Sequence, residues 1–359
     1  MSATTHVSPI RRGRFTWVLI SSLIAVVVLG ATASTATAEG AAEGTSPAVV
    51  QNPSTGVQTV FYVNEAQEIA YWTNGGGWKQ GVLGGKVAKG TSPTAMAIGS
   101  NQFVYYVNSS GEIATWALTG GKWTGPTTLG GKVASGTSPT AIHDSSGYQY
   151  IYYVNSKNEV AYWAFTVAWS GPNTIGGKVA ENSSLTATLS GANQFVYYAN
   201  SSGEFTNFTF STKWIGPTTF GGKMAAGSSP TGILDPSNNY QYIYYVNSKN
   251  EVASWAWVGE WVGPNTIGGN VAKNSNLTVT RAGANQFIYY ANSSGEFTNF
   301  TFSSKWIGPT TFAGNIWANT SPSSVLNPSN NYQYIYYLNP SGEMSDWFWA
   351  GEWFGPNTL

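Results

Sequence analysis

Short apolar and β-branched runs, separated by turns rich in glycine, asparagine and serine, follow one another along most of the chain. Residues 91–136 contain four such runs in order: SPTAMAI, QFVYYVN, EIATWAL and WTGPTTLG. Runs of this length between turn residues are typical of β-strands. The second run is apolar or aromatic at successive positions, which predicts a strand covered on both faces. We therefore expect one four-stranded antiparallel sheet from this unit.

The same unit recurs seven times. A glutamate at the start of the third run marks each copy, at intervals of 44 to 47 residues: Glu68, Glu112, Glu159, Glu204, Glu251, Glu296 and Glu343. The repeats span about 45–90, 91–136, 137–182, 183–227, 228–274, 275–319 and 320–359. A four-stranded unit with this constant period is typical of a β-propeller blade, whereas hairpin arrays or a sandwich require no such period. The predicted fold is an all-β, seven-bladed propeller at residues 45–359.

Two kinds of repeat alternate along the chain. Repeats 3, 5 and 7 share one pattern at 148–160, 240–252 and 332–344, and repeats 4 and 6 share another at 192–211 and 284–303. Each kind returns after 92 residues, which suggests growth by copying two-blade blocks. Because seven is odd, the alternation cannot close, and repeats 1 and 7, both of the odd type, must be neighbours in the ring.

The first 38 residues are typical of a signal peptide. Arg11, Arg12 and Arg14 precede an apolar stretch at 17–30, and small residues at 36–38 form a cleavage site. Residues 39–44 are then a short N-terminal tail. This predicts a secreted, extracellular protein with no membrane span in the mature chain, and an uncleaved anchor is the alternative.

Charge and cysteine content exclude several classes of protein. The chain has no cysteine, so it has neither disulfides nor thiolate metal sites. Removing the three arginines of the leader from 16 basic residues leaves 13 against 16 acidic residues, a net charge of about −3. A chain this poor in basic residues lacks the stripe that binds nucleic acid or anionic lipid.

The inventory of catalytic side chains is equally small. After the leader the chain has one histidine, one arginine and three aspartates: His143, Arg281, Asp144, Asp235 and Asp346. An arginine cluster of the sialidase type, or paired axial carboxylates of the glycosidase type, cannot be assembled from this set. Metal-binding motifs are also missing from the sequence. We expect no catalytic residues, no metal and no cofactor, and hence a protein that is not an enzyme.

Repeated aromatic residues are the main candidates for a binding surface. A tryptophan on the fourth run occurs in every repeat, which favours packing between blades because aromatic rings bury large areas. The tryptophans of the third run vary with repeat type, and Phe208 and Phe300 replace them in repeats 4 and 6. Those rings are suited either to packing or to stacking against the C–H face of a sugar. The third-run candidates are Trp72, Trp116, Trp163, Trp255 and Trp347.

Two sets of charged residues complete the candidate carbohydrate site. Glu112, Glu159 and Glu251 follow a turn, where they either bond turn amides or accept hydrogen bonds from sugar hydroxyls. Lys132 and Lys178 lie in the segment between repeats, where they are either solvated or line a site between blades. The paired tyrosines of the second run point to opposite faces, so at most one of each pair is free for a ligand.

Residues 123–139 show a pattern that recurs in other repeats, W-x-G-P-x-x-[LIF]-G-G-x-x-A-x-x-[ST]-S-P. It resembles the repeats of bacterial PLL-like and tectonin-type propeller lectins, and more distantly those of fucose-binding propeller lectins. The resemblance implies shallow pockets between neighbouring blades that hold fucosylated or O-methylated glycans. The Arg and Glu that six-bladed fucose lectins carry on the third strand are replaced here by Ala114 and Thr115.

We therefore expect a secreted, non-enzymatic lectin whose several weak sites act together by avidity. The alternative is a secreted scaffold, or the targeting subunit of an exported assembly, in which one face of the ring docks a protein partner.

Overall fold

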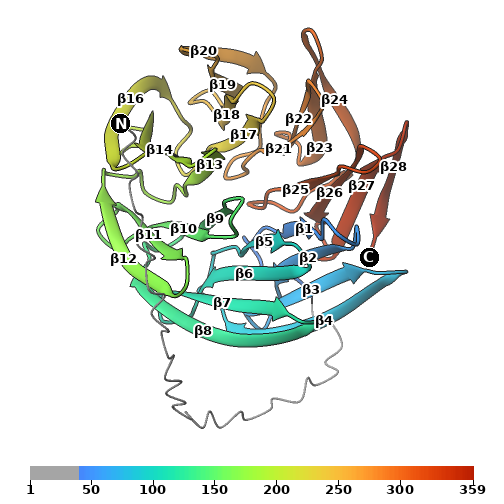
Figure 1. Cartoon of the computed structure of the whole chain (residues 1–359). Coiled ribbons are helices and arrows are strands. Elements are labelled where there is room, and N and C mark those ends of the chain that lie inside the picture. The colour runs from blue at the N-terminus through green and yellow to red at the C-terminus, as the bar shows by residue number, and fades with distance from the viewer. Residues whose placement is uncertain (1–39) are drawn as a thin grey trace, which may run out of the picture. The chain divides into compact units, whose positions relative to one another are not determined.

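The computed structural model describes residues 40–359, so the predicted signal peptide at 1–38 lies outside the described residues. In the described part, 28 strands form seven separate four-stranded antiparallel sheets, and this part contains no helix. Figure 1 shows the sheets arranged radially, in chain order, around a common axis. The predicted all-β, seven-bladed propeller is confirmed.

Each blade is one continuous stretch of chain. Blade 1 contains β1 (Ala48–Gln51), β2 (Gln58–Val63), β3 (Glu68–Asn74) and β4 (Trp78–Lys86). Blade 2 contains β5 (Thr94–Ile98), β6 (Asn101–Val107), β7 (Glu112–Thr119) and β8 (Lys122–Lys132). Blade 3 contains β9 (Thr140–His143), β10 (Gln149–Val154), β11 (Val160–Phe165) and β12 (Trp169–Gly176). Blade 4 contains β13 (Thr186–Ser190), β14 (Asn193–Ala199), β15 (Glu204–Phe210) and β16 (Trp214–Lys223).

The remaining three blades follow the same plan. Blade 5 contains β17 (Thr231–Asp235), β18 (Tyr240–Val246), β19 (Val252–Trp257) and β20 (Trp261–Gly268). Blade 6 contains β21 (Thr278–Ala282), β22 (Asn285–Ala291), β23 (Glu296–Phe302) and β24 (Trp306–Asn315). Blade 7 contains β25 (Ser323–Asn327), β26 (Tyr332–Leu338), β27 (Met344–Trp349) and β28 (Trp353–Thr358). The first strand of each blade lies nearest the axis and the fourth forms the outer edge (Figure 1).

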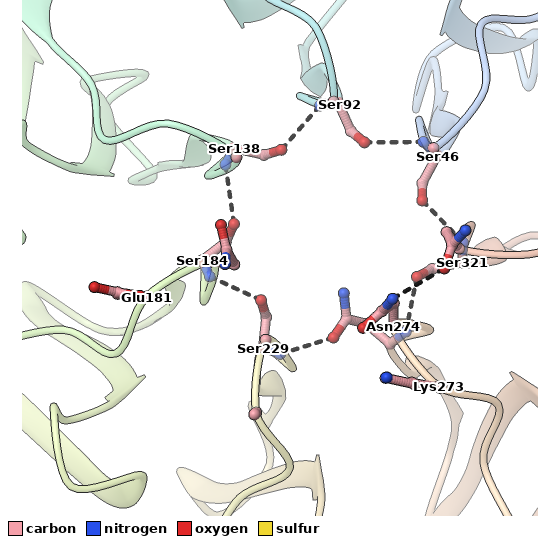
Figure 2. Close-up of a pocket in the computed structure, with 17 residues that line it drawn as sticks. Ser46, Ser92, Ser138, Glu181, Ser184, Ser229, Lys273, Asn274 and Ser321 are labelled. Carbon is pink, nitrogen blue, oxygen red and sulfur yellow. Dashed lines mark hydrogen bonds between the residues drawn. The ribbon is translucent and has the colours of Figure 1, made fainter.

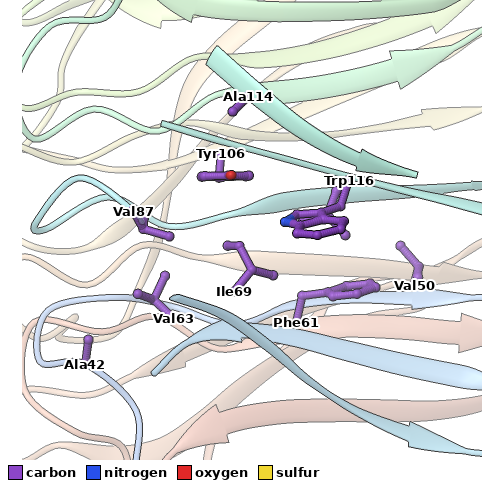
Figure 3. Close-up of a cluster of buried hydrophobic side chains, with 10 residues drawn as sticks. Ala42, Val50, Phe61, Val63, Ile69, Val87, Tyr106, Ala114 and Trp116 are labelled. Carbon is purple, nitrogen blue, oxygen red and sulfur yellow. The ribbon is translucent and has the colours of Figure 1, made fainter. Parts of the chain in front are cut away.

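The second strand of each blade is covered on both faces, as its unbroken apolar run predicts. All six residues of β2 are buried. In β6, Tyr106 packs with residues of blade 1, whereas Tyr105 packs with residues of blade 3. Figure 3 shows one such core, in which Phe61 and Ile69 of blade 1 face Trp116 of blade 2. The hydrophobic core is thus divided into layers between neighbouring blades.

The ring closes without any exchange of strands. All four strands of blade 1, and all four of blade 7, come from their own repeat. At the seam between these blades, Val49 N donates a hydrogen bond to Ser323 Oγ at 3.2 Å. Ala41 N, in the predicted N-terminal tail, donates to Gly342 O at 2.9 Å. Repeats 1 and 7 are therefore neighbours, joined by face packing and hydrogen bonds.

A closed circle of seven hydrogen bonds surrounds the axis (Figure 2). In each bond the backbone N–H at the start of one blade donates to a side-chain oxygen at the same position of the next blade, over 2.7–2.9 Å. The seven positions, which we call the axial ring, are Ser46, Ser92, Ser138, Ser184, Ser229, Asn276 and Ser321. The residue two positions earlier has a positive φ and is always glycine or asparagine, for example Gly136 at 72° and Asn182 at 57°. These two residue types tolerate that backbone conformation best.

A second circle of bonds lies deeper between the blades. The tyrosine hydroxyl of the second strand donates to a glutamine side chain at the start of the second strand in the next blade. Six pairs are formed: Tyr105–Gln149, Tyr152–Gln194, Tyr197–Gln241, Tyr244–Gln286, Tyr289–Gln333 and Tyr336–Gln58. Blade 1 has Phe61 in place of the tyrosine, so Gln102 of blade 2 lacks this bond and its buried Oε1 has no partner among the described residues.

Among residues 40–359 there is no helix with the length and apolar character needed to cross a bilayer.

Candidate functional site

The third-strand tryptophans lie at the interfaces between blades. Trp116, Trp163, Trp255 and Trp347 have only 9%, 8%, 6% and 7% of their surfaces exposed. Ala114 and Trp116 lie on the same face of β7, and both pack with buried residues of blade 1. The Trp116 side chain is therefore turned toward the preceding blade. Such burial suits packing, one of the two roles that the sequence left open, and it leaves only a narrow edge of each ring exposed for a ligand.

Glycines on both sides explain how these rings fit. Trp116 Nε1 donates to Gly84 O of blade 1 at 3.2 Å, and Trp163 and Trp347 make the equivalent bonds to Gly130 O and Ala313 O. On the other side, a Cβ on Gly125 of the same blade would lie 2.8 Å from the Trp116 ring. Two backbone segments therefore enclose the indole, and one of them comes from the preceding repeat.

Trp72 differs from the other four because it is only partly buried. The fourth strand of blade 1 lacks the Gly-Pro pair that covers Trp116, and Gln80 lies opposite Trp72 in the register of β3 and β4. Gln80 Nε2 donates to Tyr62 OH at 2.7 Å. Burial raises the pKa of Tyr62, so this hydroxyl stays protonated and can act as a donor. The seam between blades 7 and 1 thus places an indole ring beside an amide and a phenol.

The charged candidates form ion pairs at the edges of the blades. Glu112 pairs with Lys132 at 3.1 Å and Glu159 with Lys178 at 3.1 Å, with 59% and 60% of the lysine side chains exposed. Hydrogen bonds from Lys178 and Asn155 lower the pKa of Glu159. In blade 5, where Asn270 replaces the lysine, Glu251 accepts a bond from Asn247 Nδ2 at 3.1 Å instead. Exposed pairs of this kind contribute little stability. The charged ends of these lysine and glutamate side chains are open to solvent.

The tryptophans and the ion pairs do not form one pocket. Glu112 and Trp116 are four residues apart on β7, which corresponds to about 13 Å along a strand. The structure therefore places the predicted site residues in two separate zones of each interface, an aromatic zone between the blades and a charged zone at the turn.

The fourth-strand tryptophans pack between blades, as expected from their presence in every repeat. Each one contacts an aromatic ring of the second strand in the preceding blade, edge to face, with ring centroids 5.7–6.1 Å apart. The pairs are Trp78–Tyr336, Trp123–Phe61, Trp169–Tyr105, Trp214–Tyr152, Trp261–Tyr197, Trp306–Tyr244 and Trp353–Tyr289. This geometry is a favoured one for aromatic pairs.

The titratable residues of the described part are dispersed. Between residues 40 and 359, no group of three His, Cys, Asp or Glu side chains is placed to hold a metal ion. His143 is exposed, and its Nδ1 lies 3.0 Å from the Asp144 carbonyl oxygen. Asp235 and Arg281 form a 2.6 Å ion pair between blades 5 and 6.

Two polar features of the interfaces, the axial ring and the tyrosine–glutamine bonds, were not predicted from the sequence. Both features have a recurring sequence pattern. A glutamine precedes the aromatic run in all seven repeats, and a serine or asparagine occupies the axial position in all seven. Recurrence alone did not reveal that these side chains bond to the next blade, since the partners lie 42 to 47 residues apart, and 275 or 278 residues apart across the seam between blades 7 and 1.

No protein-family model matches the sequence, and no curated protein matches it. Solved structures are similar in fold. AofleA from Arthrobotrys oligospora is 16% identical, with a TM-score of 0.58 over 88% of this chain and 86% of that one. The fucose-specific lectin from Aleuria aurantia is 19% identical, with a TM-score of 0.54 over 72% of this chain and 91% of that one. SapL1 lectin, solved with α-methyl fucoside, is 19% identical, with a TM-score of 0.55 over 72% and 93%.

These similarities establish the fold. The Aleuria aurantia protein is a six-bladed propeller. Its match over 72% of this chain is what a ring with one blade fewer would give.

Proposed function

We propose that this protein is a secreted, non-enzymatic lectin that binds glycans at the interfaces between its blades. The observation that carries the proposal is the seam between blades 7 and 1, where the partly open ring of Trp72 lies beside Gln80 and Tyr62. An aromatic ring beside a few fixed polar groups is the usual composition of a small-molecule site. The fold supports the same class of ligand, because similar propellers are lectins solved with fucosides.

In this proposal a sugar stacks its C–H face on Trp72, and the Gln80 amide and Tyr62 hydroxyl take its hydroxyl groups. Narrower sites at the other interfaces use the exposed edges of Trp116, Trp163, Trp255 and Trp347. The ion pairs of Glu112 with Lys132 and of Glu159 with Lys178, together with Glu251, bind further sugar units at the turn zone.

Repetition around the ring would make such weak sites effective. A millimolar site corresponds to only about −4 kcal/mol. Sites on one rigid ring that reach a repetitive glycan surface at the same time gain strength by avidity. Blades with different third-strand residues are expected to contribute unequally.

The identity of the sugar is proposed only as fucosylated or O-methylated, in keeping with PLL-like and tectonin-type lectins. The positions that carry the Arg and Glu of six-bladed fucose lectins are occupied by Ala114 and Thr115, which are 1% and 7% exposed. A small side chain buried between two blades cannot supply that charge pair. A fucose site here would need a different set of contacts.

A glycan array with the purified protein, including O-methylated and microbial cell-wall sugars, tests the proposal. We expect hits that a free monosaccharide competes away and that Trp72→Ala abolishes. Trp123→Phe is the matched control, because Trp123 packs against Phe61 between blades 1 and 2 and belongs to none of the proposed sites, so this variant should retain binding. An array without hits, on a sample whose circular dichroism shows folded β-structure, would contradict the proposal.

One observation favours a second candidate, a scaffold that docks a protein partner. The residue after the fourth-strand tryptophan is apolar and exposed in four consecutive blades: Ile215 55%, Val262 42%, Ile307 53% and Phe354 40%. Blades 1 to 3 have polar residues at the same position: Lys79, Thr124 and Ser170. Apolar side chains clustered on one side of a surface are typical of interaction sites. A partner recovered from culture medium by the native chain, and lost with Ile215→Lys and Ile307→Lys together, would favour the scaffold.

A further inference from the structure

The axial ring encloses a cavity whose lining differs from that of the blade interfaces. The cavity has a volume of about 580 Å³ and is lined by serine, asparagine, glycine and alanine, with Glu181 and Lys273 as its charged residues. Figure 2 shows the ring side chains around this opening. Aromatic side chains are absent from the lining within the described part of the chain.

The ring hydroxyls have unused hydrogen-bonding capacity. Each serine Oγ of the ring accepts one backbone N–H, as Ser92 Oγ does from Ser46 N at 2.9 Å. A hydroxyl also has one proton to donate and a second lone pair. Among residues 40–359, nothing accepts the proton of the six ring serines, and the Nδ2 of Asn276 is likewise free. The ring therefore presents groups that both donate and accept.

Charge and size indicate the class of ligand that fits this cavity. Glu181 and Lys273 have opposite signs, so the lining has no net charge to attract an ion. The volume falls within the roughly 300–1,000 Å³ of small-molecule sites, which is far larger than one oxyanion requires. Groups that donate and accept at once match the hydroxyls of a neutral sugar or polyol, since those also do both.

A branch extends from this cavity toward blade 5. A second cavity of about 410 Å³ lies at blade 5, between the connections that join this blade to blades 4 and 6, and shares Ala226, Lys273 and Asn274 with the first. Ser275 lines it and is 2% exposed, and its Oγ has no hydrogen-bond partner among the described residues. At the equivalent position of five blades the hydroxyl donates to the carbonyl three residues earlier: Thr45, Thr91, Thr137, Ser228 and Thr320. A buried hydroxyl without a partner costs free energy, so it marks a place where a ligand would gain a bond.

We propose that the axial cavity and its branch at blade 5 form a second carbohydrate site, for the end of a neutral glycan. One sugar unit occupies the axial ring and is held by the serine hydroxyls, and the next unit enters the branch and bonds to Ser275 Oγ. This site relies on the proposed function only for the class of ligand, because it shares no residue with the seam at Trp72.

Methionine resonances can locate the ligand. Met224 lines the branch and packs between blades 4 and 5, whereas Met96 packs between blades 2 and 3 and Met344 between blades 7 and 1. In protein labelled with ¹³C at the methionine methyl groups, we expect maltose, cellobiose, lactose or N,N′-diacetylchitobiose at millimolar concentration to shift the Met224 signal and leave the other two in place. Ser275→Ala should weaken that titration at least threefold without changing the unfolding temperature, because no internal bond is lost.

Thr137→Ala is the matched control. It removes the equivalent hydroxyl in blade 3, which donates to Ala134 O at 2.9 Å, so it should lower stability and leave the titration unchanged. The proposal is overturned if no disaccharide shifts Met224, if Ser275→Ala has no effect, or if inorganic phosphate displaces the sugar. Glycan binding that is lost with Trp72→Ala but unaffected by Ser275→Ala would contradict the axial site and support the proposed function. Binding that is weakened by Ser275→Ala but unaffected by Trp72→Ala would contradict only the seam site.

Discussion

The hydroxyl of Tyr336 in blade 7 donates a hydrogen bond to the side-chain oxygen of Gln58 in blade 1, across 278 positions of the sequence. Both side chains are buried, at 0% and 5% exposure. Tyr336→Phe should therefore destabilise the ring by about 1–3 kcal/mol, the cost of leaving a buried acceptor without a partner. Denaturant unfolding monitored by tryptophan fluorescence measures the change. An unchanged midpoint would show that the bond contributes nothing to closure.

Phe61→Tyr should have the opposite effect. Phe61 occupies the tyrosine position of blade 1, and the Oε1 of Gln102 opposite it is buried without a partner. A hydroxyl at this position would complete the seventh tyrosine–glutamine bond. We expect an increase of about 1 kcal/mol in the free energy of unfolding. Phe205→Tyr, in an aromatic cluster with no orphaned acceptor opposite it, is the control and should give no increase.

Asp346 should make stability depend on pH. Its side chain faces the seam between blades 7 and 1, is 6% exposed, and has a buried Oδ1 without a partner among the described residues. Burial raises the pKa of Asp346 to about 6, although a hydrogen bond with Asn357 acts to lower it. Because the folded-state pKa exceeds the ordinary value, the folded state favours the protonated form. Stability should therefore fall as pH rises from about 4 through 6, by about 3 kcal/mol for a shift of two pH units.

Asp346→Asn tests this expectation directly. Asn207 and Asn299 occupy the same position in blades 4 and 6, so the amide fits the fold. The variant should be more stable than the native chain at pH 8 and equally stable near pH 4. Its own free energy of unfolding should change little between these pH values. Equal thermal-shift profiles for native and Asp346→Asn proteins would contradict the assignment.

The ion pair between Asp235 and Arg281 should behave in the opposite sense. Burial alone would raise the pKa of Asp235, but bonds from Ser237 and the Arg281 charge lower it below the usual range. Its contribution is present at neutral pH and is lost as pH falls through that lowered pKa. Arg281→Met should cost about 3 kcal/mol at pH 7 because it leaves a buried carboxylate unpaired. Asp235→Asn combined with Arg281→Met should recover most of the loss, and a double variant as unstable as the single one would argue against the pairing.

Third-strand tryptophans should separate into two classes. Trp116→Phe removes the indole bond to Gly84 O and should lower stability by about 1 kcal/mol. Trp72→Phe removes no indole bond found within the described residues, so its unfolding free energy should change less while glycan binding falls. Calorimetric unfolding of both variants, beside the array, distinguishes these effects. A larger stability loss at Trp72 than at Trp116 would assign Trp72 to packing as well.

The sequence was sufficient for the fold because every repeat contains the same four runs, and the unbroken apolar run QFVYYVN requires a neighbour on each face. It was insufficient for the binding site, because burial of a third-strand tryptophan depends on another repeat. Trp116 is enclosed in part by Gly84 and Gly85, more than 30 residues earlier. The exposure of Trp72 likewise depends on the fourth strand of blade 1, which lacks the Gly-Pro pair that covers Trp116. The recurrence of tryptophan along the sequence does not show this difference.

The axial ring also determines how the molecule can come apart. All seven bonds run in the same direction around the axis, and the bond from Ser321 to Ser46 forms only when the last blade reaches the first. A linear repeat protein has end units that fray at the cost of a single interface. A closed ring has no end unit, so releasing any blade breaks two interfaces at once. The seven blades are therefore held as one cooperative unit, although each is a separate sheet.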